Sequence, residues 1–134
     1  MAWGRIALAV LASAFVSSMT DWLFMGDWLY KRYDRNPEIW RYRAGQGENK
    51  AILWSSLLPF VTCAVFILVC ARLHLYSYSA TLKLAVAIWL IGPLPLTIVN
   101  ALWIKLSPAI ATSHALGWLV KLGIAAVAVT LILR

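Results

Sequence analysis

The chain has 134 residues, of which 63% are hydrophobic and only 13% are charged, and its mean hydropathy is +0.79. Soluble globular proteins carry charge on about a quarter of their residues, so this composition excludes an ordinary soluble domain. The net charge of +7 would suggest nucleic acid in a soluble protein, but half of the lysines and arginines fall in one connection between apolar stretches. Membrane orientation explains that clustering better. We expect an integral membrane protein of one domain, residues 1–134, that binds no nucleic acid.

Four stretches are apolar for about 20 residues, the length that an α-helix needs to cross the hydrocarbon core. Because the backbone must satisfy its own hydrogen bonds in lipid, each stretch is predicted to be a helix. The four predicted spans cover about residues 4–25, 51–73, 79–104 and 114–133. Short connections after the second and third spans make neighbouring helices antiparallel. The predicted fold class is therefore all-α, an integral membrane four-helix bundle.

The long connection between the first two helices, residues 26–50, interleaves aromatic and basic side chains. Such a pattern can bind nucleic acid, but at a membrane edge it holds rings in the interface and cations on anionic headgroups. We expect the membrane role, with the first helix extending to about residue 33. Asn36 and Pro37 would then cap and open a short interfacial helix. The predicted membrane-surface residues are Trp22, Trp28, Arg32, Arg35, Trp40, Arg41 and Arg43.

Basic residues are unequally divided between the two sides of the predicted bundle. Seven lie in the first and third connections, four lie on the side of the chain ends, and the twelfth, Lys121, lies inside a span. By the positive-inside rule, the loop at residues 26–50 is predicted to face the cytoplasm. The apolar start of the chain could be a signal peptide, but its apolar run continues to Met25, so we expect a retained helix.

Lys121 is predicted to lie about 10 Å below the side of the first connection, since it follows His114 by two helical turns. A lone charge near the centre of a bilayer costs about 2.5 to 3.5 kcal/mol even on the lenient insertion scale, so it needs a partner or a route to water. Asp21 is the one acidic residue inside a predicted span, and it lies near the end of the first helix, on the same side. The sequence therefore predicts that Asp21 and Lys121 form an ion pair.

Each predicted helix also carries a stripe of polar or small side chains at helical spacing. The stripes predict a polar pocket between the helices, near the side of the first connection. Its candidate ligand-binding residues are Asp21, Asn100, His114 and Lys121, flanked by Ser17, Ser55 and Ser56. Other interpretations stay open: a structural ion pair, a lysine that extends its stem to the interface, a ligand or ion site, or catalysis.

The third span contains Gly92, Pro93 and Pro95 close to its middle. Two prolines remove two backbone donors, so this helix is predicted to kink or break there. Broken helices at mid-depth mark binding sites in many transporters, because the freed backbone groups face a cavity. A packing kink without function is the alternative.

Several chemistries are disfavoured by the sequence. His74 and His114 are predicted on opposite faces of the membrane, which argues against a haem held by two histidines. We find no zinc or di-iron spacing, no glycine-rich phosphate loop and no nucleophile elbow. We therefore predict no metal, no cofactor and no catalytic residue, and an enzyme stays open only through an Asp, Lys and His combination.

Three segments, SSMTDWLFMGDWLY, GPLPLTIVNALWIKLSP and HALGWLVKL, resemble an uncharacterised family of small four-helix bacterial membrane proteins. The resemblance implies a four-span architecture in the bacterial cytoplasmic, or inner, membrane. It implies no known chemistry, so no residue role follows from it.

These observations lead to a first expectation about function, the binding or transport of a small anionic or amphipathic ligand with Lys121 as its charge partner. The alternative is a structural or accessory subunit of a larger membrane complex. A third hypothesis is a lipid-modifying enzyme that uses Asp21 or His114. Four short helices rarely enclose a transport path alone, so the expected partners are membrane lipid, a small ligand, and either further copies of the chain or a larger complex.

Overall fold

The computed structural model describes residues 3–27 and 48–134, with side chains described for residues 3–24 and 49–134. The described residues are helical and contain no strand, which confirms the all-α prediction. The elements are α1 (Trp3–Asp21), the π-helix η1 (Trp22–Asp27), α3 (Glu48–Arg72), α4 (Tyr78–Ile91), α5 (Pro93–Trp103) and α6 (Pro108–Ile132). Four stretches are long and apolar enough to cross a membrane: Trp3–Phe24, Asn49–Arg72, Tyr78–Trp103 and Pro108–Ile132.

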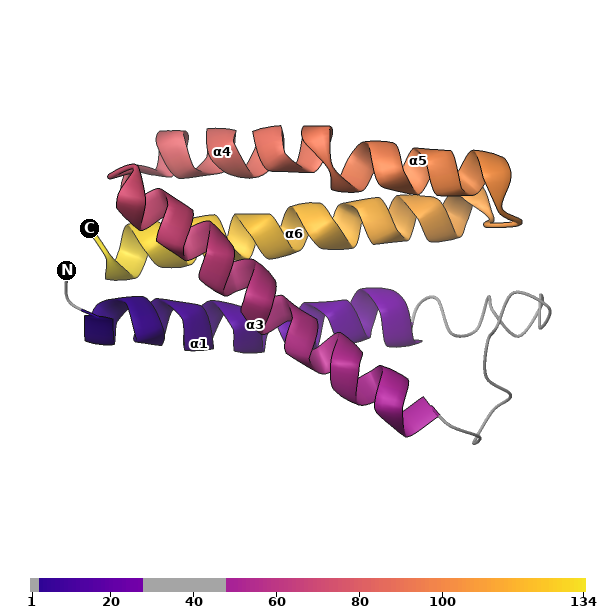
Figure 1. Cartoon of the computed structure of the whole chain (residues 1–134), viewed down its shortest axis with the longest axis horizontal. Coiled ribbons are helices and arrows are strands. Elements are labelled where there is room, and N and C mark those ends of the chain that lie inside the picture. The colour runs from indigo at the N-terminus through magenta and orange to yellow at the C-terminus, as the bar shows by residue number, and fades with distance from the viewer. Residues whose placement is uncertain (1–2, 28–47) are drawn as a thin grey trace.

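The helix α6 is the centre of the structure. It lies between α1 on one side and the α4–α5 pair on the other, while α3 crosses in front of it at an oblique angle (Figure 1). Half of the apolar stretch of α6 is buried against other helices, whereas only 11% of the α4–α5 stretch is buried. Near the middle of α6, the side chains of Lys121 and Leu122 are buried by the rest of the protein.

Small residues allow the helices to approach one another closely at the core of α1, α3 and α6. Ala9, Ala125 and Ala126 are fully buried there, beside Ile67 and Val129. Lipid tails are as apolar as leucine, so helices in a membrane associate through close packing of this kind and through hydrogen bonds. This core lies toward the end of the bundle that carries both chain ends.

Hydrogen bonds attach α4 to α6. The hydroxyl groups of Thr81 and Thr130 lie 3.3 Å apart and both are buried. The indole nitrogen of Trp89 donates to the backbone oxygen of Ala115 over 2.7 Å. Polar contacts between helices are worth about 0.6 to 2 kcal/mol each in a membrane. They therefore hold α4 on a helix against which little of it is buried.

The fourth helix begins at Pro108, not at His114, so the predicted start was wrong. Ser107 caps it by accepting a hydrogen bond from the backbone nitrogen of Ile110, and Pro108 occupies a first-turn position in which its missing N–H costs nothing. A segment that looked like a polar connection is thus the first turn of the helix. As a consequence Lys121 lies about 20 Å along the axis from the helix start, near its middle and not near one end.

The predicted break in the third span is confirmed. Its residues form two helices, α4 and α5, which meet at Gly92, whose φ of −117° and ψ of −81° are not helical. Pro93 and Pro95 have no N–H, so the carbonyls of Trp89 and Ile91 lack the donor that a continuous helix would supply. The break is therefore a direct result of the two prolines.

The first helix changes from an α-helix to a π-helix after Asp21. It continues beyond that residue as the π-helix η1, Trp22–Asp27, which accounts for the predicted span to Met25. The predicted extension to residue 33 and the predicted interfacial helix lie outside the described residues. Of the predicted membrane-surface residues, Trp22 is exposed. The other six lie outside the described residues: Trp28, Arg32, Arg35, Trp40, Arg41 and Arg43.

The turn between α3 and α4 contains a non-glycine residue in the left-handed region, His74, with a φ of 54°. The backbone nitrogen of Leu75 donates to the oxygen of Cys70, and that of His74 donates to the oxygen of Ala71. These two bonds form a Schellman motif, in which glycine is the usual residue at the left-handed position. His74 therefore holds this position at a cost that glycine would avoid.

Replacing His74 with glycine is expected to raise the free energy of unfolding by about 1 kcal/mol, because a side chain in the left-handed conformation costs about 1 to 2 kcal/mol. The matched control is His74→Ala, which removes the same ring but keeps a Cβ and so keeps the strain. Unfolding of both variants in mixed micelles should show a higher free energy of unfolding for His74→Gly alone. An equal increase in His74→Ala would mean that the effect comes from loss of the imidazole and not from relief of backbone strain.

Candidate functional site

The charged pair predicted from the sequence lies at the junction of α1 and α6. The Lys121 Nζ atom is 2.6 Å from the Asp21 Oδ2 atom. Side chains on an α-helix lean toward its N-terminus, and these two helices run in opposite directions (Figure 1). Lys121 therefore leans toward the η1 end of the bundle and Asp21 leans away from it. This explains how an acid at the end of α1 reaches a lysine at the middle of α6.

Both side chains of the ion pair are largely buried, and Lys121 is more buried than Asp21. The side chain of Lys121 is 8% exposed and that of Asp21 is 18% exposed. The Lys121 ammonium also lies over the ring of Trp118, 4.7 Å from the ring centre, where the π-electrons attract a cation. The lysine thus obtains its stabilisation inside the protein and does not extend its stem to the interface.

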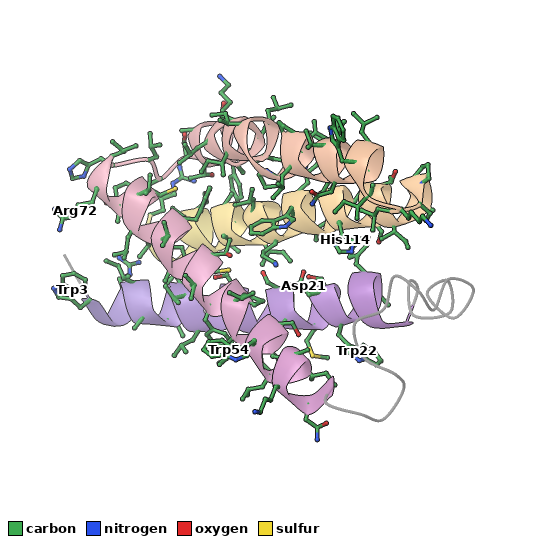
Figure 2. The ribbon with its side chains drawn as sticks, turned by 45° about the vertical axis from the view of Figure 1, so that its right-hand side comes forward. Trp3, Asp21, Trp22, Trp54, Arg72 and His114 are labelled. Atoms are coloured by element: carbon green, nitrogen blue, oxygen red, sulfur yellow. The ribbon has the colours of Figure 1, made fainter. Side chains whose placement is uncertain are left out.

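His114 is the third titratable group of the site. It lies on α6, two turns before Lys121, and near enough to Asp21 for the two charges to interact. Figure 2 shows Asp21 and His114 in the same region between α1 and α6. The site therefore combines the carboxylate of Asp21 on α1 with the ammonium of Lys121 and the imidazole of His114 on α6.

The π-helix η1 fixes the position of Asp21 against α6. The hydroxyl of Ser113 donates to the backbone oxygen of Phe24 over 3.2 Å. One turn further along α6, Gly117 faces Phe24, and a Cβ there would lie 3.8 Å from the phenylalanine Cβ, an ordinary contact. Stretches of π-helix are rare and frequently occur at functional sites. Here the widened turn begins directly after the carboxylate of the ion pair.

Ser17 lies one turn deeper in α1 and is fully buried. Its hydroxyl is 3.7 Å from the sulfur of Cys63 on α3. The hydroxyl of Ser18 donates to the backbone oxygen of Ser56 over 3.3 Å. These contacts hold α3 on α1, so Ser17 supports the helix that carries Asp21. Among the described residues, its hydroxyl makes no hydrogen bond to the charged pair itself.

Ser55, Ser56 and Asn100 are not brought into contact with the ion pair. Ser55 and Ser56 are exposed, and both donate back to the oxygen of Ile52. Asn100 is half-buried on α5, and its side chain makes no hydrogen bond among the described residues. The physical reason for the serines is the oblique course of α3, whose residues 49–58 are all exposed (Figure 1). Helical spacing predicts which residues share a face but not the angle at which two helices cross.

The structure adds contacts that sequence reasoning missed. Trp118 follows the i−3 spacing from Lys121, and residues three apart on a helix are neighbours, so this signal was present in the sequence. The bond from Ser113 to the carbonyl of Phe24 had no such signal, because it depends on the π-helix. Among residues 3–27 and 48–134, no group of three His, Cys, Asp or Glu side chains could hold a metal ion.

Comparisons with protein-family models, with curated proteins and with solved structures give no match for this chain. The functional assignment therefore depends on the residues of the site alone.

Proposed function

We propose that this chain is a small integral membrane protein that binds or transports a small anionic or amphipathic ligand, with the Lys121 ammonium as the ligand's charge partner. One observation carries the proposal: an ion pair lies at the middle of the most buried membrane-spanning helix. Buried ion pairs contribute little net stability, and well-packed apolar residues often replace them without loss. Ionisable groups inside spans are therefore functional candidates by default.

Asp21 acts in this proposal as the resting counter-ion of Lys121. An incoming carboxylate or phosphate takes its place, which keeps the site electrically neutral only if the Asp21 charge leaves or is neutralised. Asp21 is suited to leave because it is the more exposed partner and ends α1. Trp118 meanwhile keeps the ammonium in position. Exchange of counter-ions then explains why a ligand could bind to a lysine that is already paired.

A second candidate is a subunit that packs against a larger membrane complex. The observation in its favour is the small buried share of the α4–α5 stretch, whose large apolar side chains face outward. Lipid tails can also cover such side chains, so this candidate comes second. It predicts that Asp21 and Lys121 affect stability only, and that another polypeptide purifies with the chain.

The charge count supports a cytoplasmic location for the loop at residues 26–50. The inner membrane of a bacterium is proposed from the resemblance of the sequence alone. A transport role would also require further copies of the chain. Four short helices rarely enclose a transport path alone.

Native mass spectrometry of the gently solubilised protein tests the proposal. The unmodified chain is compared with Asp21→Asn/Lys121→Met, in which the site is neutral and apolar and the fold is expected to persist. We expect a small-molecule or lipid adduct on the unmodified chain that the double variant lacks. A ligand at Lys121 would be contradicted if neither protein carried an adduct, or if both carried the same bound polypeptide.

A further inference from the structure

The end of the bundle opposite η1 carries basic side chains. Four basic residues lie there: Arg5, Arg72, Lys83 and Arg134. Among residues 3–24 and 49–134, whose side chains the structure describes, the one acidic residue is Asp21, which is paired with Lys121. No described carboxylate side chain therefore neutralises the four basic residues.

The fold gathers these residues from distant parts of the sequence. Both chain ends and the α3–α4 turn lie at one end of the structure (Figure 1), and Arg72 and Trp3 lie together at that end in Figure 2. The Arg5 guanidinium donates to the backbone oxygen of Arg134 over 3.3 Å, which fixes these two cations beside each other. Arg72, His74 and Lys83 are all exposed.

Helix dipoles account for some of these charges and not for all. Arg72 ends α3, and Arg5 reaches the end of α6, where cations offset the partial negative charge of the last carbonyls. Lys83 lies in the second turn of α4, where no helix C-terminus accounts for a cation. His74 keeps its exposed ring at a backbone position that glycine would occupy with less strain. Such strain is a reason to look for a function of the side chain.

We propose that this end of the bundle binds headgroups of anionic phospholipids through the exposed side chains of Arg72, His74 and Lys83. Arginine matches the geometry of phosphate oxygens, and every phospholipid headgroup carries a phosphate. The exposed rings of Trp3 and Tyr78 lie on the first turns of α1 and α4, where interfacial aromatic side chains anchor membrane helices. This site is separate from the Lys121 site and does not depend on the proposed function.

The test uses the full chain in phosphatidylcholine vesicles that contain a small fraction of spin-labelled lipid. The measured quantity is the association constant of spin-labelled phosphatidylglycerol relative to spin-labelled phosphatidylcholine. Arg72→Gln/Lys83→Gln is compared with a matched control, Lys50→Gln/Lys105→Gln, which removes two exposed lysines from the other end. His74→Gly is a third variant, measured at a pH at which imidazole is neutral.

We expect the Arg72→Gln/Lys83→Gln variant to lose most of the preference for phosphatidylglycerol, because it removes two of the three side chains that bind the headgroup. The control is expected to keep most of it, and His74→Gly is expected to lose part of it although its fold is stabilised. If the two glutamine variants lost the lipid preference equally, or if His74→Gly kept it unchanged, the preference would arise from diffuse surface charge. Either result would contradict the proposed headgroup site. Displacement of the lipid by millimolar inorganic phosphate would overturn the assignment to a headgroup.

Discussion

Replacing Lys121 with methionine is expected to lower the free energy of unfolding by about 3 to 5 kcal/mol, because it leaves the carboxylate of Asp21 buried without its partner. The same loss is expected for Asp21→Asn, which leaves an ammonium near the middle of a span. Reversible unfolding of the full chain in mixed micelles, followed by circular dichroism, measures both changes.

The double variant Asp21→Asn/Lys121→Met should recover most of the loss. Replacing both members of a buried pair is often neutral or stabilising by about 1 to 4 kcal/mol, since no charge is then removed from water. Lys83→Met is the matched control, since it makes the same substitution at an exposed lysine of α4, where the expected change is within about 0.5 kcal/mol. If Lys121→Met were no more destabilised than Lys83→Met, the ion pair would have no energetic role.

Acetate is expected to rescue the stability of Asp21→Asn. In that variant the Lys121 ammonium has lost the carboxylate that lay 2.6 Å away, so a small carboxylate from solution can take its place. A ligand that binds only the folded state stabilises it by about 2.7 kcal/mol at a concentration of 100 times its dissociation constant. The measurement is the unfolding free energy as a function of acetate concentration.

Sodium chloride at equal ionic strength controls for screening of charge, and Asp21→Asn/Lys121→Met controls for effects away from the lysine. Rescue should be absent in the double variant and weak in the unmodified chain, where Asp21 competes with acetate. Equal stabilisation of all three proteins by acetate would show a general solvent effect. No stabilisation of Asp21→Asn at any concentration would show that the site admits no external anion.

The membrane class and the number of spans followed from the sequence because they depend on composition and on apolar length alone. The helix break followed as well, because the two prolines act locally at Gly92. The start of the fourth helix did not, because Pro108 was interpreted as part of a connection when it opens a helix capped by Ser107. Proline is compatible with both positions, and only the cap distinguishes them.

The Asp21–Lys121 contact was predictable because charge inside a membrane has few possible partners, and topology limited them to one side. Ser55 and Ser56 illustrate the limit of that reasoning. Both serines were predicted to lie on the same side of the bundle as the ion pair. However, the oblique course of α3 exposes this part of the helix, and both hydroxyls donate to the backbone oxygen of Ile52. Crossing angles depend on side-chain packing along the whole interface, which helical spacing does not encode.

Binding of radiolabelled decanoate to the chain in nanodiscs, corrected for uptake by empty nanodiscs, is the most direct test of Lys121 as the charge partner of an anionic ligand. The unmodified chain is expected to bind decanoate, and Asp21→Asn to bind it at least about tenfold more tightly, a gain of about 1.4 kcal/mol from removal of the competing carboxylate. Asp21→Asn/Lys121→Met is expected not to bind it, and Lys83→Met to bind it as the unmodified chain does. The same affinity in all four proteins would contradict a ligand site at Lys121.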